Sequence, residues 1–189
     1  MKALILTGKY CTDVEFTYAL YRLQEAGFEV DVTVRGNQTV LGIIGEKIVP
    51  NKDIPDLDVN DYELLILPGG AKAMEYLRQD DDVIGFIQHF HKTGKVIGSI
   101  CHAAQLLISA GLVKGRHISG YYSIKDDIRN AGGTYVDAAY VTDGNIVSSP
   151  HYRYLGSWMK EVLRIAKENR PPNMGQIDEK VGEGEHGIE

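Results

Sequence analysis

Short apolar runs alternate with longer amphipathic segments along the chain, and this alternation predicts a sheet whose strands are joined by helices. Val, Ile, Leu and Thr dominate the runs, which is typical of buried strands. The longer segments repeat apolar residues at helical spacing, as at Phe16, Ala19 and Leu23. We expect strands at residues 2–6, 29–34, 64–67, 96–100, 135–136 and 141–149, a hairpin-like excursion at 38–49, and helices at 13–26, 74–78, 81–92, 103–110, 124–131 and 155–167.

Polar residues and glycines mark where these elements begin and end. Asp13 is expected to cap the first helix, and Gly27 to end it. Strands that alternate with helices imply crossover connections and a mostly parallel sheet. Ligands of such sheets bind at the carboxyl ends of the strands. Chemistry is therefore expected in the loops that follow Leu6, Leu67, Ile100 and Ser149.

Composition narrows the class of protein. Hydrophobic residues make up 43% and charged residues 24% of 189, as in ordinary globular domains. We expect one α/β domain at 1–168 and a polar, acidic tail at 169–189. A net charge of −6 disfavours a nucleic-acid surface. No apolar run approaches the roughly 20 residues that span a bilayer, and no signal peptide is visible. Two cysteines are too few for a disulfide framework or a usual zinc site, so we expect a cytoplasmic protein without a metal.

Cys101 stands where a predicted strand runs directly into a predicted helix. A residue at such a junction is forced into a tight turn above the carboxyl edge of the sheet, which is the geometry of a nucleophile elbow. The helix start offers free N–H groups and partial positive charge, and both favour the thiolate. The alternative is a structural cysteine buried at a strand end.

The residues around Cys101 each allow a catalytic and a structural interpretation. His102 is either the base that pairs with the thiolate or a solvent-facing residue at a helix start. Gly69 and Gly70 form a turn after the neighbouring strand, and their N–H groups, with that of His102, are candidates for an oxyanion hole. Glu15 is either an acid at a helix start, where it interacts favourably with the helix dipole, or a carboxyl near Cys101 that burial keeps protonated.

Cys11 lies in the first loop, which we expect close to the elbow. It is either a thiol that could resolve an oxidised Cys101 or an incidental loop cysteine, and the second interpretation is favoured. His89 and His91 are two positions apart on a helix, so they point to different faces and make a poor metal pair.

Several motifs together resemble the PfpI/ThiJ family, which includes archaeal intracellular proteases and the Parkinson-disease-associated deglycase. The resemblance covers about residues 1–167. It rests on Leu67-Pro-Gly-Gly70, Ile100-Cys-His102 with the segment 105–115, Ile124-Lys-Asp-Asp127 with Asn130-Ala-Gly132, and Asp143-Gly-Asn-Ile-Val-Ser148.

This resemblance implies a flavodoxin-like sandwich of the class I glutamine amidotransferase-like type, with Cys101 on the elbow and Glu15 beside it. It implies that His102 is a base, that Glu75 of a neighbouring subunit orients it, and that Tyr121 lines the pocket. A homo-oligomer, a dimer or a hexamer, and no cofactor follow from the same resemblance.

Two segments depart from the family pattern. Ala103 and Ala104 replace a usual Gly-Pro after the Cys-His pair, and Ser149-Pro150 replaces a usual Ser-Arg. His151, which follows, is expected to line the pocket with its neighbours. The second departure puts the substrate in question.

Three functions remain open from the sequence. The first is a glutathione-independent glyoxalase or deglycase in which the Cys101 thiolate adds to a small aldehyde. The second is a cysteine peptidase or amidase that uses Cys101, His102 and Glu75 on a peptide. The third is a redox-sensing or chaperone-like stress protein in which Cys101 oxidises without turnover.

Overall fold

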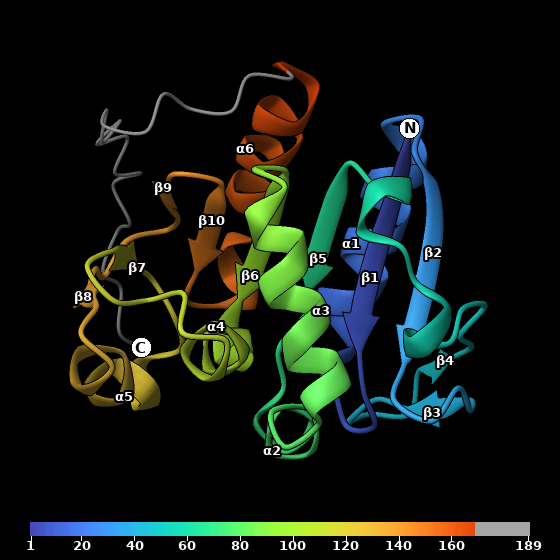
Figure 1. Cartoon of the computed structure of the whole chain (residues 1–189), viewed down its shortest axis with the longest axis horizontal. Coiled ribbons are helices and arrows are strands. Elements are labelled where there is room, and N and C mark those ends of the chain that lie inside the picture. Colours follow the sequence, from blue (N-terminus) through green and yellow to red (C-terminus); the bar gives the residue numbers. More distant parts are fainter. Residues whose placement is uncertain (169–189) are drawn as a thin grey trace.

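A six-stranded sheet forms the centre of the molecule in the computed structural model, which describes residues 1–168 (Figure 1). Its strand order is β2-β1-β5-β6-β10-β9, and only the edge strand β9 runs antiparallel to its neighbour. The six strands are β1 (Lys2–Thr7), β2 (Glu29–Val34), β5 (Leu64–Leu67), β6 (Val96–Ile100), β9 (Val141–Asp143) and β10 (Ile146–Ser149). The predicted mostly parallel sheet is confirmed.

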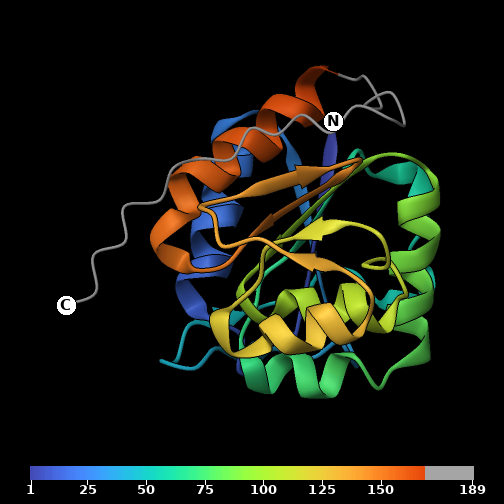
Figure 2. The same ribbon diagram turned by 90° about the vertical axis from the view of Figure 1, so that its left-hand side faces the viewer.

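Helices cover both faces of this sheet, which makes a three-layer sandwich. Helices α1 and α6 lie on one face and α3 and α4 on the other (Figure 2). The helices are α1 (Asp13–Glu25), α2 (Ala71–Leu77), α3 (Asp81–Lys92), α4 (Ala104–Ser109), α5 (Lys125–Asn130) and α6 (Leu155–Glu168). Short 3₁₀ turns lie at Ile54–Asp56, Val59–Asp61, Cys101–Ala103, Tyr122–Ile124 and Tyr152–Tyr154. The predicted flavodoxin-like, class I glutamine amidotransferase-like sandwich is confirmed.

The central strands are apolar throughout because both of their faces are covered. Every residue of β5 and β6 is buried. Gly98 of β6 is needed for this packing, since a Cβ atom there would lie 2.7 Å from Ile66 and 3.1 Å from Trp158 of α6. The Trp158 indole N–H is satisfied by the carbonyl of Val147 at 3.0 Å.

The sheet changes its direction of winding between β1 and β5. The chain moves from β1 outward to β2 on one side, and then to β5, β6 and β10 on the other side. The carboxyl ends of β1 and β5 therefore open a crevice of the kind that holds ligands in α/β sheets. Cys101 follows β6, the next strand along, so the predicted search area is one continuous edge of the sheet.

Some local predictions were wrong. Helix α2 begins at Ala71, directly after Gly70, three residues before the predicted start. The chain after Cys101 first forms a 3₁₀ turn, and α4 begins only at Ala104. The sequence pattern also missed β7 (His117–Ile118), which pairs in parallel with β8 (Thr134–Tyr135). The predicted tail at 169–189 lies outside the described residues.

Asp13 does not cap α1. Its buried carboxylate instead accepts hydrogen bonds from the N–H groups of Ile44 (2.9 Å) and Glu46 (2.8 Å). These residues form the turn between β3 (Val40–Leu41) and β4 (Lys47–Ile48). Competition explains the error, because a carboxylate at a helix start can bond to any nearby N–H group and this turn brings two of them.

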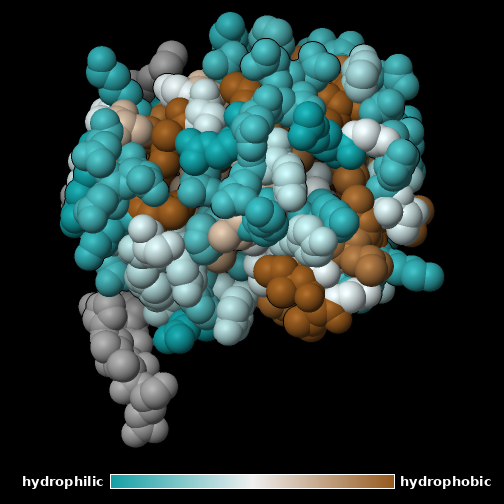
Figure 3. Space-filling view, turned by 90° about the horizontal axis from the view of Figure 1, so that it is seen from below, coloured by the Kyte–Doolittle hydropathy of each residue, from teal (hydrophilic) through white to brown (hydrophobic). Residues whose placement is uncertain are grey.

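The β3–β4 hairpin displays apolar side chains at the carboxyl edge of the sheet. Ile44 is 87% exposed although its backbone is held by Asp13, and Ile43 is 58% exposed. An apolar patch stands out among polar residues where the molecule is seen from this edge (Figure 3). Contiguous exposed apolar groups mark contact surfaces more often than single exposed apolar residues do.

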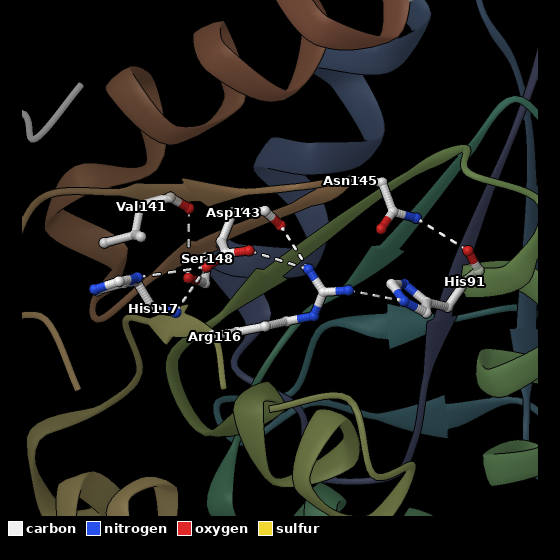
Figure 4. A network of polar contacts seen from close by, with 7 residues as sticks. All are labelled: His91, Arg116, His117, Val141, Asp143, Asn145 and Ser148. Carbon is white, nitrogen blue, oxygen red and sulfur yellow. Dashed lines mark hydrogen bonds and ion pairs between the residues drawn. The ribbon is translucent and has the colours of Figure 1, made fainter. Parts of the chain in front are cut away.

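A polar network fixes the small β7–β8 sheet to the main sheet (Figure 4). Asp143 of β9 accepts hydrogen bonds from Arg116 (3.0 Å) and from the backbone N–H of His117 (2.8 Å). Arg116 also reaches the ring of His91, at the end of α3, at 3.2 Å. The network therefore anchors β7 beside the amino-terminal end of β10, at the opposite edge of the sheet from Cys101.

Candidate active site

Cys101 has the backbone of a nucleophile elbow. Its φ is 61°, a left-handed conformation that residues other than glycine rarely adopt, and its side chain is nearly buried, with the residue 6% exposed. Strain of this kind persists where the surrounding structure enforces it, and it concentrates at functional sites. The turn is enforced because β6 ends at Ile100 and the 3₁₀ turn begins at Cys101 with no intervening loop.

Glu15 lies beside Cys101 and is completely buried. The N–H group of Gly69 donates to its Oε2 atom at 2.7 Å. Its Oε1 atom is buried without a nitrogen or oxygen partner among the described residues, and the carboxyl interacts with the Cys101 thiol. Burial raises the pKa of Glu15 from 4.5 to about 7, although the hydrogen bonds from Gly69 and Cys101 lower it.

The thiol of Cys101 is subject to opposing effects. Burial raises its pKa, and a charged Glu15 raises it further, whereas backbone hydrogen bonds from His102 and Gly70 lower it. Two buried acids in contact titrate as a pair, so the charge on one depends on the proton of the other. The thiolate expected from the sequence stays a prediction, and it requires a neutral Glu15.

The two glycines after β5 have different roles. Gly69 uses its N–H group to hold Glu15, whereas that of Gly70 faces the Cys101 sulfur together with the N–H group of His102. A Cβ atom on Gly69 would lie 2.7 Å from the carbonyl oxygen of Ile100 and 2.8 Å from Cβ of Cys101. The candidate oxyanion hole thus consists of Gly70 and His102, and Gly69 allows the close approach of the two strand ends.

His102 is in contact with the sulfur across the elbow. Its Nδ1 atom lies 3.4 Å from Sγ of Cys101, and its Nε2 atom lies 3.3 Å from Oγ of Ser123. Burial lowers the pKa of the imidazole, so the neutral form, which can accept a proton, is favoured. The tautomer depends on the two hydrogen bonds, and Ser123 can either donate or accept.

Tyr121 and His151 extend the site on the far side of His102. The Tyr121 ring stacks on that of His102 with centroids 4.5 Å apart, and its backbone N–H donates to the carbonyl of Cys101 at 3.0 Å. The His151 ring lies 5.9 Å from that of Tyr121. The structure therefore brings together the predicted residues Cys101, His102, Glu15, Gly69, Gly70, Tyr121 and His151.

Glu75 is the predicted residue that a single chain does not bring to the site. It lies on α2 with an exposed side chain, and it pairs with Lys72 at 2.8 Å. Within the chain, Ser123 contacts the Nε2 atom of His102, the atom to which the predicted Glu75 carboxylate would otherwise bind.

The sequence analysis missed Ser123 and Tyr122 near the site, and it included Tyr152 only as a neighbour of His151 in the pocket. Ser123 bonds to His102, and the two tyrosine rings lie 6.2 and 4.0 Å from the ring of His151. The two tyrosine-rich segments at 121–122 and 152–154 were the available signal, but only the fold places residues 121–123 and 151–152 side by side. Cys11 is fully buried, and burial raises its pKa to about 12.

Comparison with known proteins decides the family. The model of the DJ-1/PfpI family matches residues 1–165. This chain belongs to the DJ-1/PfpI family. The resemblance expected from the motifs is confirmed. None of the helices within residues 1–168 has the length and apolar character that crossing a membrane requires.

Relatives within the DJ-1/PfpI family carry enzyme names. Deglycase TK1284 of Thermococcus kodakarensis is 36% identical over 88% of this chain and 100% of its own. YraA of Bacillus subtilis, named as a candidate cysteine protease, is 36% identical over 87% of this chain and 97% of its own. The solved two-domain protein of Anabaena variabilis, with DJ-1/ThiJ/PfpI-like and ferritin-like domains, superposes with a TM-score of 0.84 at 30% identity, over 87% of this chain and 49% of that protein.

Proposed function

We propose that this protein is a glutathione-independent enzyme of the glyoxalase or deglycase type, which acts on small reactive carbonyls through Cys101. The observation that supports it most is the contact between a strained, nearly buried thiol and a fully buried carboxyl whose pKa is about 7. A carboxyl with this pKa can both give and take a proton near neutral pH. The deglycase names of relatives support the same chemistry.

The proposed reaction begins with addition of the Cys101 thiolate to the aldehyde carbon of a 2-oxoaldehyde. The oxygen of the resulting hemithioacetal carries the negative charge, and the N–H groups of Gly70 and His102 would stabilise it. The product of this step is covalently bound through a C–S bond. A methylglyoxal adduct on an amine could enter by the same attack, with the amine as leaving group.

Proton transfer then oxidises the former aldehyde carbon and reduces the neighbouring carbonyl carbon. Glu15, after giving its own proton to the hemithioacetal oxygen, or neutral His102 removes the hydrogen of the former aldehyde carbon as a proton, and the neighbouring carbonyl oxygen is protonated to give an enediol. The neighbouring carbon then takes a proton as the hydroxyl on the former aldehyde carbon loses one. The result is a thioester of a 2-hydroxy acid. Water cleaves the C–S bond of the thioester, releases the 2-hydroxy acid and restores the thiol, so that aldehyde and water are the only reactants.

A direct assay tests this proposal. Methylglyoxal should be converted to lactate without glutathione, without added metal and in the presence of a chelator. Cys101→Ala should reduce the rate to background, and Cys11→Ala serves as the matched thiol control. Activity that appears only with glutathione, or that Cys101→Ala retains, would contradict the proposal.

A cysteine peptidase is the second candidate, because His102 is in contact with the Cys101 sulfur and YraA carries a protease name. The same protein preparations should be offered a fluorogenic peptide. Cys101-dependent peptide cleavage that exceeds methylglyoxal turnover would favour this function. Under either function we propose a cytoplasmic homo-oligomer, since both cysteines are free thiols and the carboxyl edge exposes apolar residues.

A further inference from the structure

Ser123 contacts the ring nitrogen of His102 that does not face the sulfur. Its Oγ atom lies 3.3 Å from Nε2, while Nδ1 of the same ring lies 3.4 Å from Sγ of Cys101. Ser123 has an exposed side chain and belongs to the 3₁₀ turn Tyr122–Ile124, so it reaches the elbow from another segment of the chain. The imidazole is therefore in contact at both nitrogens, with the nucleophile at one and a hydroxyl at the other.

The two contacts determine which nitrogen can act as a base. A neutral imidazole carries one proton, so one of its nitrogens donates a hydrogen bond and the other accepts one. Nδ1 can take the proton of the Cys101 thiol only if it carries none itself. The proton of the neutral ring must then be on Nε2, and the Ser123 oxygen must accept its hydrogen bond. In the opposite tautomer Nδ1 would direct its own N–H at the sulfur and could not act as the base.

The other groups around the sulfur are donors. The backbone N–H groups of Gly70 and His102 face it, and the carboxyl of Glu15 interacts with it. With Glu15 protonated, its O–H can donate to the sulfur as well, and all three donors then favour the thiolate. None of these donors can take the thiol proton, whereas an unprotonated Nδ1 of His102 can.

Tyr121 fixes the plane of the His102 ring but not the place of its proton. The two rings stack with centroids 4.5 Å apart and planes at 27°, and a ring face is the same kind of partner for either tautomer. Burial lowers the pKa of His102, and no carboxylate within residues 1–168 contributes to that shift. The Ser123 hydroxyl is thus the group in the described chain that can set the tautomer.

We propose that Ser123 is a positioning residue, which accepts a hydrogen bond from Nε2–H of His102 and keeps Nδ1 free to take the thiol proton of Cys101. In that step the S–H bond breaks, its electron pair stays on the sulfur and an N–H bond forms at Nδ1. The imidazolium then donates from both nitrogens, so Ser123 accepts the same hydrogen bond before and after the transfer. Its own hydroxyl proton stays available for water or for a carboxylate that a neighbouring subunit brings. This inference rests on the proposed function in that it takes Cys101 as the nucleophile.

The pH profile of Cys101 alkylation tests this role without a substrate, because the rate with iodoacetamide follows the thiolate fraction. Ser123→Ala should lower the rate at neutral pH about 2- to 12-fold, the range that one neutral hydrogen bond supplies. The two profiles should converge at the alkaline end, where the thiol loses its proton to solvent. Ser123→Thr keeps a hydroxyl and should restore the wild-type profile. Ser157→Ala, which removes an exposed hydroxyl from α6, is the matched control.

Nitrogen NMR of the His102 ring supplies a second measurement, since the chemical shift of a ring nitrogen reports whether it carries a proton. Above the pKa of His102, wild type should show Nε2–H, and Ser123→Ala should show a mixture of the two tautomers. If both results appear but no glyoxal is turned over, the positioning role stands and the proposed function fails. An unchanged alkylation profile in Ser123→Ala, or the Nδ1–H tautomer in wild type, would overturn the positioning role whatever substrate the enzyme accepts.

Discussion

At Cys101, backbone and side chain are adapted to each other. The left-handed backbone holds the sulfur near the N–H groups of Gly70 and His102. A buried thiol would otherwise resist ionisation, because burial disfavours the charged form. Reactivity therefore depends on local donors that compensate for lost water.

The two thiols should react at very different rates. Iodoacetamide at neutral pH should alkylate Cys101 before Cys11. Burial raises the pKa of both thiols, but Cys11 is fully buried, whereas Cys101 is 6% exposed and its sulfur faces the N–H groups of Gly70 and His102. Peptide mass mapping after timed quenching would show the order. Cys101→Ala protein should then label only on unfolding. Preferential labelling of Cys11 in folded protein would contradict the proposed site.

Glu15 gives the protein a stability that depends on pH. Its pKa is about 7 in the folded chain and 4.5 in its ordinary state, so the folded protein holds a proton that the unfolded chain releases between these values. The stability that this proton contributes is complete below pH 4.5 and is lost as pH rises through 7. Glu15→Gln does not titrate and should gain about 3 kcal/mol relative to wild type between pH 4.5 and 8.

Urea unfolding of both proteins across this range measures that difference. Histidines whose pKa is lowered, such as His91, titrate in both proteins and cancel in the comparison. Glu15→Gln should keep the hydrogen bond from Gly69, because the amide oxygen can accept it. The same variant should lose turnover of methylglyoxal. A stability difference that does not change with pH would contradict the raised pKa.

At the scale of elements, Asp13 joins α1 to the β3–β4 hairpin. Burial disfavours its charge, but the hydrogen bonds from Ile44 and Glu46 prevail and lower its pKa. Its contribution to stability is therefore present above the ordinary value of 3.8 and is lost as pH falls through the lower folded value. The same first turn of α1 carries Glu15, so these hydrogen bonds also fix the segment that holds the Glu15 carboxyl.

Asp13→Ala should destabilise the protein by about 1–3 kcal/mol, because two backbone donors lose a charged acceptor. Asp13→Asn should cost less, since its carbonyl oxygen can still accept. Asp126→Ala, which removes an exposed acid from α5, is the control. Urea unfolding gives the free energies, and limited proteolysis should show faster cleavage at 42–46 in Asp13→Ala. Unchanged stability and cleavage would show that Asp13 does not hold the β3–β4 hairpin.

For the whole molecule, Glu75 raises the question of assembly. Within one chain it is exposed on α2 and pairs with Lys72. The edge that carries α2 also carries the exposed apolar hairpin. A neighbouring subunit on this edge could bring its own Glu75 to His102, where a carboxylate would orient the ring as the third member of a triad does.

Subunit mixing tests that arrangement. Glu75→Ala and Cys101→Ala proteins should each be inactive, and refolding them together should restore part of the activity in mixed oligomers. Glu25→Ala, an exposed glutamate on the far end of α1, is the matched control and should stay active. A fully active monomer by light scattering, or an unimpaired Glu75→Ala protein, would leave Ser123 as the only partner of His102 that is needed.

The sequence by itself determined the layers, the strand ends and the place of Cys101 at the elbow. Strand and helix periodicities are local, and a cysteine at a strand-to-helix junction has few alternatives to the elbow. The family motifs lie in the same segments, so they indicated Glu15, His102, Gly70 and Tyr121 as well. Gly70 and His102 lie within three residues of a strand end and Glu15 lies on the first turn of the helix after β1, which is why their positions along the chain were informative.

Only the tertiary structure decided which partner each of these residues contacts. Gly69 bonds to Glu15 whereas Gly70 faces the sulfur, Asp13 bonds to a distant hairpin, and Ser123 reaches His102. The stacked rings of His102, Tyr121 and His151 come from positions 19 and 30 apart along the chain. Hydrogen-bond partners and ring contacts depend on ångström distances between segments that are far apart in the sequence and that only folding brings together. A pattern along one segment carries no information about the partner that arrives from another.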